Sequence, residues 1–129
     1  MTGRYLLDTS SAIALFAGDP GALDHLADAE AVFVPSIVLG ELYYGARKSN
    51  QPEANLARID DFAANAVILA CDGDTARRYG QVKDRLRRQG QPLPENDIWI
   101  AAIAIQHGLA LATRDNHFGE VEGLSVAAW

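Results

Sequence analysis

The sequence predicts a three-layer α/β/α domain with a central, mainly parallel sheet of about five strands. The chain has 129 residues, a length at which one compact domain over residues 1–129 is expected. Short apolar runs alternate along the chain with longer segments of helical periodicity, and turn-forming Gly and Pro residues separate them. The apolar runs are continuous rather than alternating with polar residues, which is typical of strands that are buried on both faces.

The first two expected strands cover residues 5–7 and 31–34. A polar turn follows the first strand and opens a helix that reaches Phe16. Pro35 ends the second strand, because proline cannot donate to a strand ladder. Ser36 is then the expected N-cap of the next helix.

The last three expected strands cover residues 67–70, 109–113 and 124–127. Asp72 or Asp74 is expected to cap the helix that follows the first of these strands. Gly108 is a suitable residue to end the helix before the fourth strand, because glycine readily adopts the left-handed conformation found there.

The composition limits the classes of function. Eleven Lys and Arg residues against 17 Asp and Glu residues give a formal net charge of −6, which at first argues against a nucleic-acid partner. The longest uncharged apolar run, residues 98–105, is too short to cross a bilayer. Cys71 is the single cysteine and cannot form an internal disulfide, so a reducing, cytoplasmic location is expected.

Four acidic residues stand where a surface role explains them poorly. Asp8 and Asp115 follow the first and fourth strands, at the edge where such sheets bind ligands, although either suits an N-cap or turn equally well. Glu41 has apolar or small neighbours three and four positions away on its helix, so we expect it to point inward unless an Arg or Lys pairs with it. Asp97 opens a helix that is apolar all round, where capping by Asp97 or Asn96 is the competing explanation.

These four carboxylates would need a counter-charge if they converge. Two unit charges about 4 Å apart repel by roughly 4 kcal/mol at an effective dielectric constant of about 20. A divalent cation removes the repulsion, and an all-oxygen ligand set favours Mg²⁺ or Mn²⁺ over Zn²⁺. Such an ion suits phosphodiester hydrolysis, because it activates water and stabilises charge on phosphate oxygens.

Four short motifs occur in a fixed order along the chain. They are Leu6-Leu7-Asp8-Thr9-Ser10, Gly40-Glu41-Leu42-Tyr43-Tyr44-Gly45, Asn96-Asp97-Ile98-Trp99-Ile100-Ala101-Ala102 and Thr113-Arg114-Asp115-Asn116-His117-Phe118. In their order and spacing the chain resembles the PIN domain family, and within it the VapC-type ribonuclease toxins of prokaryotic toxin–antitoxin pairs. The resemblance implies an endoribonuclease that depends on Mg²⁺ or Mn²⁺. It also implies a homodimer, with a small antitoxin whose C-terminal segment covers the active site.

The resemblance implies an acidic site made of Asp8, Glu41, Asp97 and Asp115. Asp8 and Asp97 are the expected direct ligands of the ion. Asp115 and Glu41 would hold waters of the ion, a second ion or the attacking water. Thr113 and Asn116 match positions near the metal site in related sequences and are expected to orient its ligands. His117 is expected to have a structural role, although it is close to Asp115 and could face the cleft.

A basic segment offers a surface for RNA. Six of the 11 basic residues fall between positions 77 and 88, on a segment with the periodicity of an amphipathic helix. Such a helix usually presents a solvated outer face. Because a nuclease needs a surface that holds phosphates, we nevertheless expect RNA contact by Arg77, Arg78, Lys83, Arg85 and Arg88.

Two other functions are compatible with the sequence. One is another Mg²⁺-dependent phosphohydrolase with Asp8 as its nucleophile. A phosphatase of the haloacid dehalogenase type would want a second acid two residues later, where Ser10 stands. The other is a catalytically silent PIN-like module that binds RNA or protein. Loss of an acid would favour that module, and all four acids are present.

Overall fold

The computed structural model describes residues 3–129 and contains one five-stranded sheet in which every neighbouring pair of strands is parallel. The order of the strands across the sheet is β3-β2-β1-β4-β5. This arrangement confirms the predicted fold class and number of strands. The strands are β1 (Arg4–Leu7), β2 (Ala31–Pro35), β3 (Val67–Leu69), β4 (Ala110–Thr113) and β5 (Val126–Ala128).

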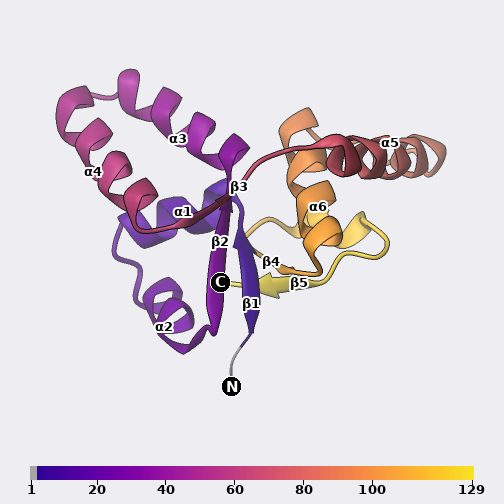
Figure 1. Ribbon diagram of the computed structural model, residues 1–129, viewed down its shortest axis with the longest axis horizontal. Helices are drawn as coiled ribbons and strands as arrows, with labels where there is room; N and C mark the ends of the chain where they lie inside the picture. The colour runs from indigo at the N-terminus through magenta and orange to yellow at the C-terminus, as the bar shows by residue number, and fades with distance from the viewer. Residues whose placement is uncertain (1–2) are drawn as a thin grey trace.

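Helices cover both faces of the sheet (Figure 1). Helices α1 to α4 lie on one side, and α5 and α6 lie on the other, as right-handed crossovers between parallel strands require when the chain reverses its direction across the sheet. The helices are α1 (Thr9–Phe16), α2 (Pro20–Asp28), α3 (Ser36–Arg47), α4 (Pro52–Ala64), α5 (Gly73–Arg88), α6 (Glu95–His107) and the 3₁₀ helix η1 (Asn116–Glu120).

β1 is the central strand of the sheet. β2 and β3 lie on one side of it, and the chain then crosses back to place β4 and β5 on the other. Leu7 of β1 is in register with Ala112 of β4, and the backbone N–H of Asp8 donates to the carbonyl oxygen of Ala112 at 3.2 Å. The carboxyl ends of β1 and β4 therefore form a topological switch point, which is where sheets of this kind bind ligands.

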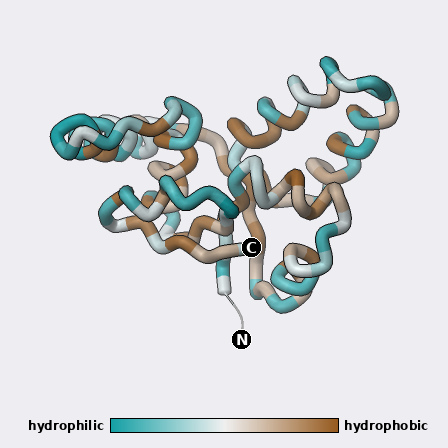
Figure 2. The backbone as a smooth tube through the Cα atoms, turned by 180° about the vertical axis from the view of Figure 1, so that it is seen from behind, coloured by the Kyte–Doolittle hydropathy of each residue, from teal (hydrophilic) through white to brown (hydrophobic). Residues whose placement is uncertain are grey.

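Buried apolar side chains join the sheet to the helices on each face. Leu6, Leu7 and Leu111 of the central strands are completely buried, as are Ile100 and Ile103 of α6. Figure 2 shows hydrophobic segments in the strands and polar segments on the outer helices. The central part of α6 is buried, as its sequence predicts. Within residues 3–129, no helix combines the length and the hydrophobicity needed to cross a membrane.

The helix ends confirm two predictions and correct a third. Asp72 caps α5 by accepting from the backbone N–H of Thr75 at 3.0 Å, and Gly108 ends α6 with a φ of 65°. Ser36, however, is the first residue of α3 rather than its N-cap. Pro35 is the N-cap, and α3 begins without a side-chain cap.

Candidate active site

A cleft of about 470 Å³ opens at the carboxyl ends of β1 and β4. Each acid of the predicted site comes from a different segment: the ends of β1 and β4, α3, and the first turn of α6. The parallel strands and the helices packed on them thus bring together residues that are far apart in the sequence. The acids that line the cleft are Asp8, Glu41, Glu95, Asp97 and Asp115.

Asp8 is buried at the base of the cleft, with 2% of its surface exposed. Its Oδ1 accepts from the backbone N–H of Ser11 at 2.9 Å and from the Ser10 hydroxyl at 2.8 Å. Asp8 is therefore the N-cap of α1 and a lining residue of the cleft at the same time. The capping and ligand explanations of its position, which compete in the sequence, are compatible in the structure.

Thr113 connects two of the acids. Its hydroxyl donates to Oδ2 of Asp8 and accepts from the backbone N–H of Asp115 at 3.0 Å. Because Thr113 is buried, this link has little freedom to move. Asn116, unlike Thr113, is exposed and lies at the start of η1. Within residues 3–129, it is not among the residues that line the cleft.

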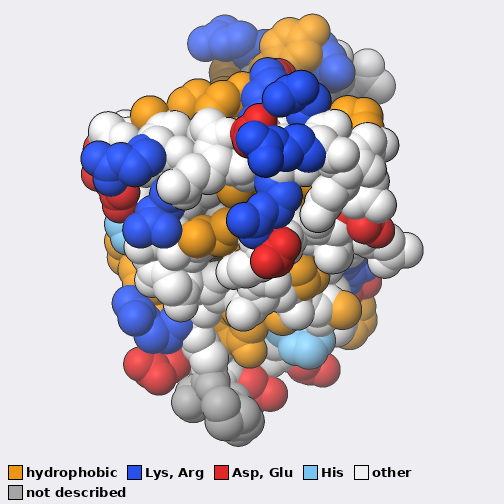
Figure 3. Space-filling model, turned by 90° about the vertical axis from the view of Figure 1, so that its right-hand side faces the viewer, with side chains coloured by type: hydrophobic (Ala, Val, Ile, Leu, Met, Phe, Trp, Pro, Cys, Tyr) orange, Lys and Arg blue, Asp and Glu red, His pale blue; other side chains and the backbone are white. Residues whose placement is uncertain are grey.

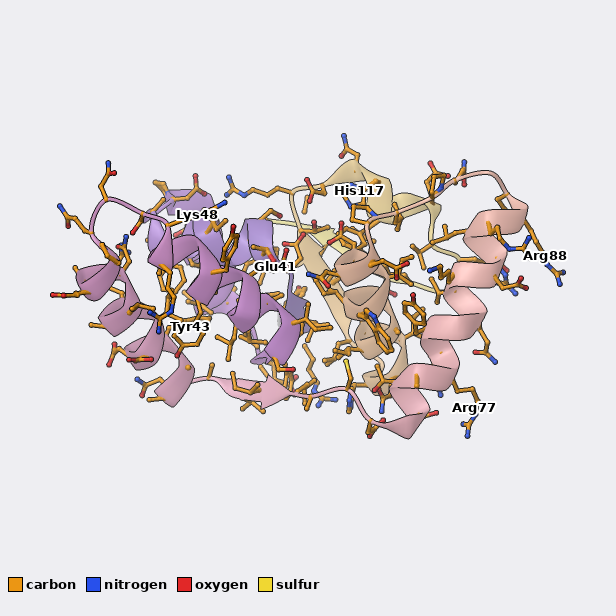
Figure 4. The ribbon with its side chains drawn as sticks, turned by 90° about the horizontal axis from the view of Figure 1, so that it is seen from above. Glu41, Tyr43, Lys48, Arg77, Arg88 and His117 are labelled. Carbon is orange, nitrogen blue, oxygen red and sulfur yellow. The ribbon has the colours of Figure 1, made fainter. Side chains whose placement is uncertain are left out.

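Glu41 lies on the side of α3 that faces α6 (Figure 4). Its Oε1 accepts from the hydroxyl of Thr9 at 2.6 Å. In the part of the chain that the structure describes, no Lys or Arg forms an ion pair with Glu41. The partner-cation explanation of its inward position is therefore wrong, and its charge is directed into the cleft.

Asp97 lies in the first turn of α6 but does not cap it. α6 begins two residues earlier, at Glu95, with Pro94 as its N-cap and without a side-chain cap, so capping by Asn96 or Asp97 is also wrong. Burial raises the pKa of Asp97. The hydrogen bond from His117 opposes this rise, whereas the negative charges nearby raise the pKa further. Those charges belong to Glu41 and Asp115.

Two residues of the cleft region have contacts that the sequence did not predict. His117 lies with Nε2 at 3.0 Å from Oδ2 of Asp97, so it contacts an acid of the site rather than only packing against the fold. Glu95 adds a fifth carboxylate to the lining. The sequence feature that could have indicated them is their position, because each of these residues is two positions from a predicted acid.

The basic segment forms the exposed face of α5, with acidic side chains interspersed (Figure 3). Arg77 and Arg88 mark its two ends (Figure 4). Each basic residue of this segment pairs with a nearby acid. Of these residues, within the described range 3–129, Lys83 is the one whose acidic partner lines the cleft. The pairs are Arg77–Asp74 and Arg78–Asp74 at 3.1 and 3.4 Å, Arg87–Asp84 and Arg88–Asp84 at 3.0 and 3.1 Å, Arg85–Glu122 at 3.1 Å, and Lys83–Glu95.

The donor atoms of the cleft suit a hard divalent cation, because they are carboxylate and hydroxyl oxygens. Within residues 3–129, no three His, Cys, Asp or Glu side chains are grouped closely enough to hold a metal ion. Three of the acids are instead hydrogen-bonded to protein groups: Asp8 to Thr113, Glu41 to Thr9 and Asp97 to His117. The chemistry of the cleft thus fits Mg²⁺ or Mn²⁺, and binding would require the side chains to approach one another.

Comparison with known proteins agrees with this architecture. Residues 5–124 match the PIN domain. The chain is 38% identical over 131 residues to Ribonuclease VapC2 of Haemophilus influenzae, an alignment that covers 98% of each chain. It is 33% identical over 129 residues to the tRNA(fMet)-specific endonuclease VapC of Shigella flexneri, again over 98% of each chain.

The crystal structure of DNA-bound VapBC from Salmonella typhimurium contains a chain with the same fold. That chain superposes with a TM-score of 0.89 at 30% identity, and 98% of each chain is covered. The likeness extends over the whole sheet and both helical layers, including the segments that form the acidic cleft. The chain belongs to the PIN domain family and, within it, to the VapC proteins.

Proposed function

We propose that this protein is a Mg²⁺- or Mn²⁺-dependent endoribonuclease that acts as the toxin of a toxin–antitoxin pair. The observation that carries the proposal is the convergence of four acids on one cleft at the switch point of the sheet. Relatives named as ribonucleases align with almost the whole chain, which supports RNA as the substrate. The four acids are Asp8, Glu41, Asp97 and Asp115.

In this proposal Asp8 and Asp97 hold the divalent ion. When bound, the ion activates water and stabilises negative charge on the phosphate oxygens. Asp115 and Glu41 complete the set of oxygen ligands or orient the attacking water. Thr113 positions this group, because its hydroxyl contacts both the Asp8 side chain and the Asp115 backbone.

The surroundings of Asp8 favour this chemistry over that of a phosphatase with a nucleophilic aspartate. A phosphatase of the haloacid dehalogenase type would have an acid two residues after the nucleophile. Here Ser10 donates to Asp8 and accepts from the backbone N–H of Arg114 at 3.1 Å, so it links the first turn of α1 to the segment that follows β4. A catalytically silent module is disfavoured because all four acids line the cleft.

The proposed partners are an antitoxin and a second copy of the chain. Solved relatives are VapBC assemblies, including the one from Salmonella typhimurium and VapBC2 from Rickettsia felis. By this analogy, a small antitoxin would cover the acidic cleft of a homodimer. The basic face of α5 would contact the RNA backbone, at Arg77, Arg78, Lys83, Arg85 and Arg88.

The experiment that tests the proposed function is metal-dependent RNA cleavage. Purified protein should cut total RNA with Mg²⁺ or Mn²⁺, and a chelator should abolish the cleavage. Because relatives are named as specific for tRNA(fMet), that tRNA is the first defined substrate to test. Hydrolysis of a generic phosphate ester, measured in parallel, distinguishes a ribonuclease from a general phosphohydrolase.

Asp97→Asn provides the matched inactive variant. The change removes a ligand charge but keeps the shape of the side chain, so cleavage should fall by at least about a hundredfold while the thermal unfolding midpoint is retained. Full cleavage by folded Asp97→Asn protein would contradict the assignment of the site. Growth arrest on expression, relieved by co-expression of the adjacent open reading frame, would test the toxin role.

A further inference from the structure

Glu95 is the one lining acid whose carboxylate pairs with a Lys or Arg, in the part of the chain that the structure describes. The Lys83 ammonium donates to its Oε1, and the Tyr79 hydroxyl donates to its Oε2. The two donors are neighbours, with Lys83 Nζ at 3.2 Å from the Tyr79 hydroxyl oxygen. Two donors from one turn of α5 therefore converge on one anion at the edge of the cleft.

The position of these donors is set by the packing of α5 on α6. The Tyr79 ring stacks on Trp99 of α6, with ring centroids 4.0 Å apart and an interplanar angle of 15°. Lys83 Nζ lies 5.6 Å from the centroid of the Tyr79 ring, so the ring also interacts favourably with the ammonium. Neither contact involves Glu95, so both donors have contacts that hold them in addition to the carboxylate that they bind.

We propose that Lys83 and Tyr79 form a phosphate-binding subsite at the edge of the cleft, in which the Glu95 carboxylate lies until a phosphate of the RNA backbone displaces it. The proposal rests on the proposed function, because RNA is the ligand. A phosphate presents two oxygens to a pair of donors as a carboxylate does, and hydrogen bonds from an ammonium to either anion are strong. The subsite would thus place the RNA backbone next to the acids that cut it.

Exposure of the Lys83–Glu95 pair makes this exchange feasible. The Lys83 side chain is 49% exposed and the Glu95 side chain is 56% exposed, and ion pairs in such positions add little net stability. The Lys83 ammonium and the Glu95 carboxylate form a direct ion pair at this position. Departure of Glu95 would leave a full positive charge for the incoming phosphate.

The other basic residues of α5 lack this arrangement. Arg77, Arg78, Arg87 and Arg88 pair with acids of α5 itself, away from the cleft. Arg85 pairs with Glu122, beyond η1. Exchange at those pairs would hold RNA on the outer face of the helix, whereas exchange at Lys83 holds it beside the acids.

A double-mutant cycle on RNA binding tests the subsite. The probe is a fluorescein-labelled single-stranded polyuridine oligonucleotide, and its anisotropy is measured in chelator so that no cleavage occurs. Lys83→Met should weaken binding by about fivefold and reduce the salt slope by about 1, because one phosphate contact is lost. Glu95→Gln should strengthen binding by about threefold, because the competing anion is removed.

The deciding result is whether the effect of Glu95→Gln on RNA affinity depends on the presence of Lys83. In the Lys83→Met background, Glu95→Gln should have no effect, because no ammonium is left to release. Tyr79→Phe, which keeps the ring stack and removes the hydroxyl, should weaken binding to a smaller extent than Lys83→Met. Equal strengthening by Glu95→Gln in both backgrounds would show a general effect of charge and would overturn the proposal.

Asp84→Asn is the matched control, because Asp84 is also an exposed acid paired with basic residues of α5 but does not line the cleft. Its effect on binding should be the same with Lys83 present or replaced. An RNA affinity that Lys83→Met does not change would overturn the subsite, even if the protein cuts RNA. A protein that follows the cycle but cuts no RNA with Mg²⁺ or Mn²⁺ would contradict the proposed function alone.

Discussion

His117 contacts Asp97, with Nε2 at 3.0 Å from Oδ2, so that η1 and the first turn of α6 meet at the acidic cleft. A histidine N–H donated to a ligand carboxylate orients it, as outer-shell partners do in metal sites. His117→Ala should therefore lower the apparent affinity for Mg²⁺ in RNA cleavage by about 10- to 100-fold. His117→Gln, which retains a donor, should lose less. An unchanged Mg²⁺ titration for His117→Ala would show that the contact is only structural.

Asp8 combines two roles that substitutions can separate. Asp8→Asn should abolish cleavage, because a ligand charge is lost, yet leave the stability almost unchanged, because Asn is as good an N-cap as Asp. Asp8→Ala should abolish cleavage and also destabilise the fold by about 1 kcal/mol through loss of the cap on α1. Urea unfolding and RNA cleavage, measured on both variants, check this. Equal free energies of unfolding for Asp8→Asn and Asp8→Ala would show that the Asp8 side chain does not stabilise α1 as a cap.

Thr113 positions Asp8, and its replacement should affect catalysis more than folding. Thr113→Val keeps the shape of the side chain but removes the hydroxyl that joins Asp8 to the Asp115 backbone. Cleavage at limiting Mg²⁺ should fall by about 10- to 100-fold. Thr113→Ser restores the hydroxyl and should recover most of the activity. Failure of Ser to do better than Val would show that the methyl group, rather than the hydroxyl, is what the site requires.

The outer face of α5 should contribute to RNA binding through charge. Arg85→Ala combined with Arg88→Ala should reduce the slope of log affinity against log salt concentration by about 2, since two phosphate contacts are lost. Arg47→Ala, which removes an exposed charge from the end of α3, is the control and should leave the slope unchanged. A slope that the double variant does not alter would exclude this face of α5 from the RNA footprint.

Asp72 should make the stability of the fold depend on pH. Hydrogen bonds from the Thr75 backbone, from Gln106 and from the Thr75 hydroxyl lower the pKa of Asp72. A carboxyl group with a lowered pKa stabilises the fold above its unfolded pKa of about 3.9, and this contribution is lost as the pH falls through the folded pKa. Asp72→Ala should therefore lower the unfolding midpoint most at neutral pH, and less below about pH 4. A pH-independent difference would contradict this assignment.

The sheet could be predicted from the sequence because its strands are short, continuous apolar runs, and differences arose at their ends. The fifth strand was expected from residue 124 but begins at Val126, because Leu124 takes part in a turn by donating to the carbonyl of Val121. The start of α6 was misplaced because Pro94 ends the loop without a side-chain cap, a pattern that polar N-cap preferences do not reveal.

Asp8 and Asp115 could be predicted because parallel strands bring their carboxyl ends to one edge, and Glu41 and Asp97 because each is an acid on an apolar helix segment. The roles of His117 and Glu95 could not. Each depends on how η1 or α5 packs on α6, and the periodicity of one helix does not specify the neighbour that it meets. Lys83 illustrates the limit: the sequence placed it on a basic helix, whereas its contact with the cleft follows from the α5–α6 pair.

The acidic cleft has a consequence for the order of events during synthesis. Its carboxylates are translated in the order Asp8, Glu41, Asp97 and Asp115, and β4, which carries the last of them into place, inserts beside the first strand of the chain. A nascent chain still inside the ribosome at Asp115 cannot have a complete set of acids. The proposed nuclease is thus inactive until β4 has inserted beside β1, because Asp115 directly follows β4.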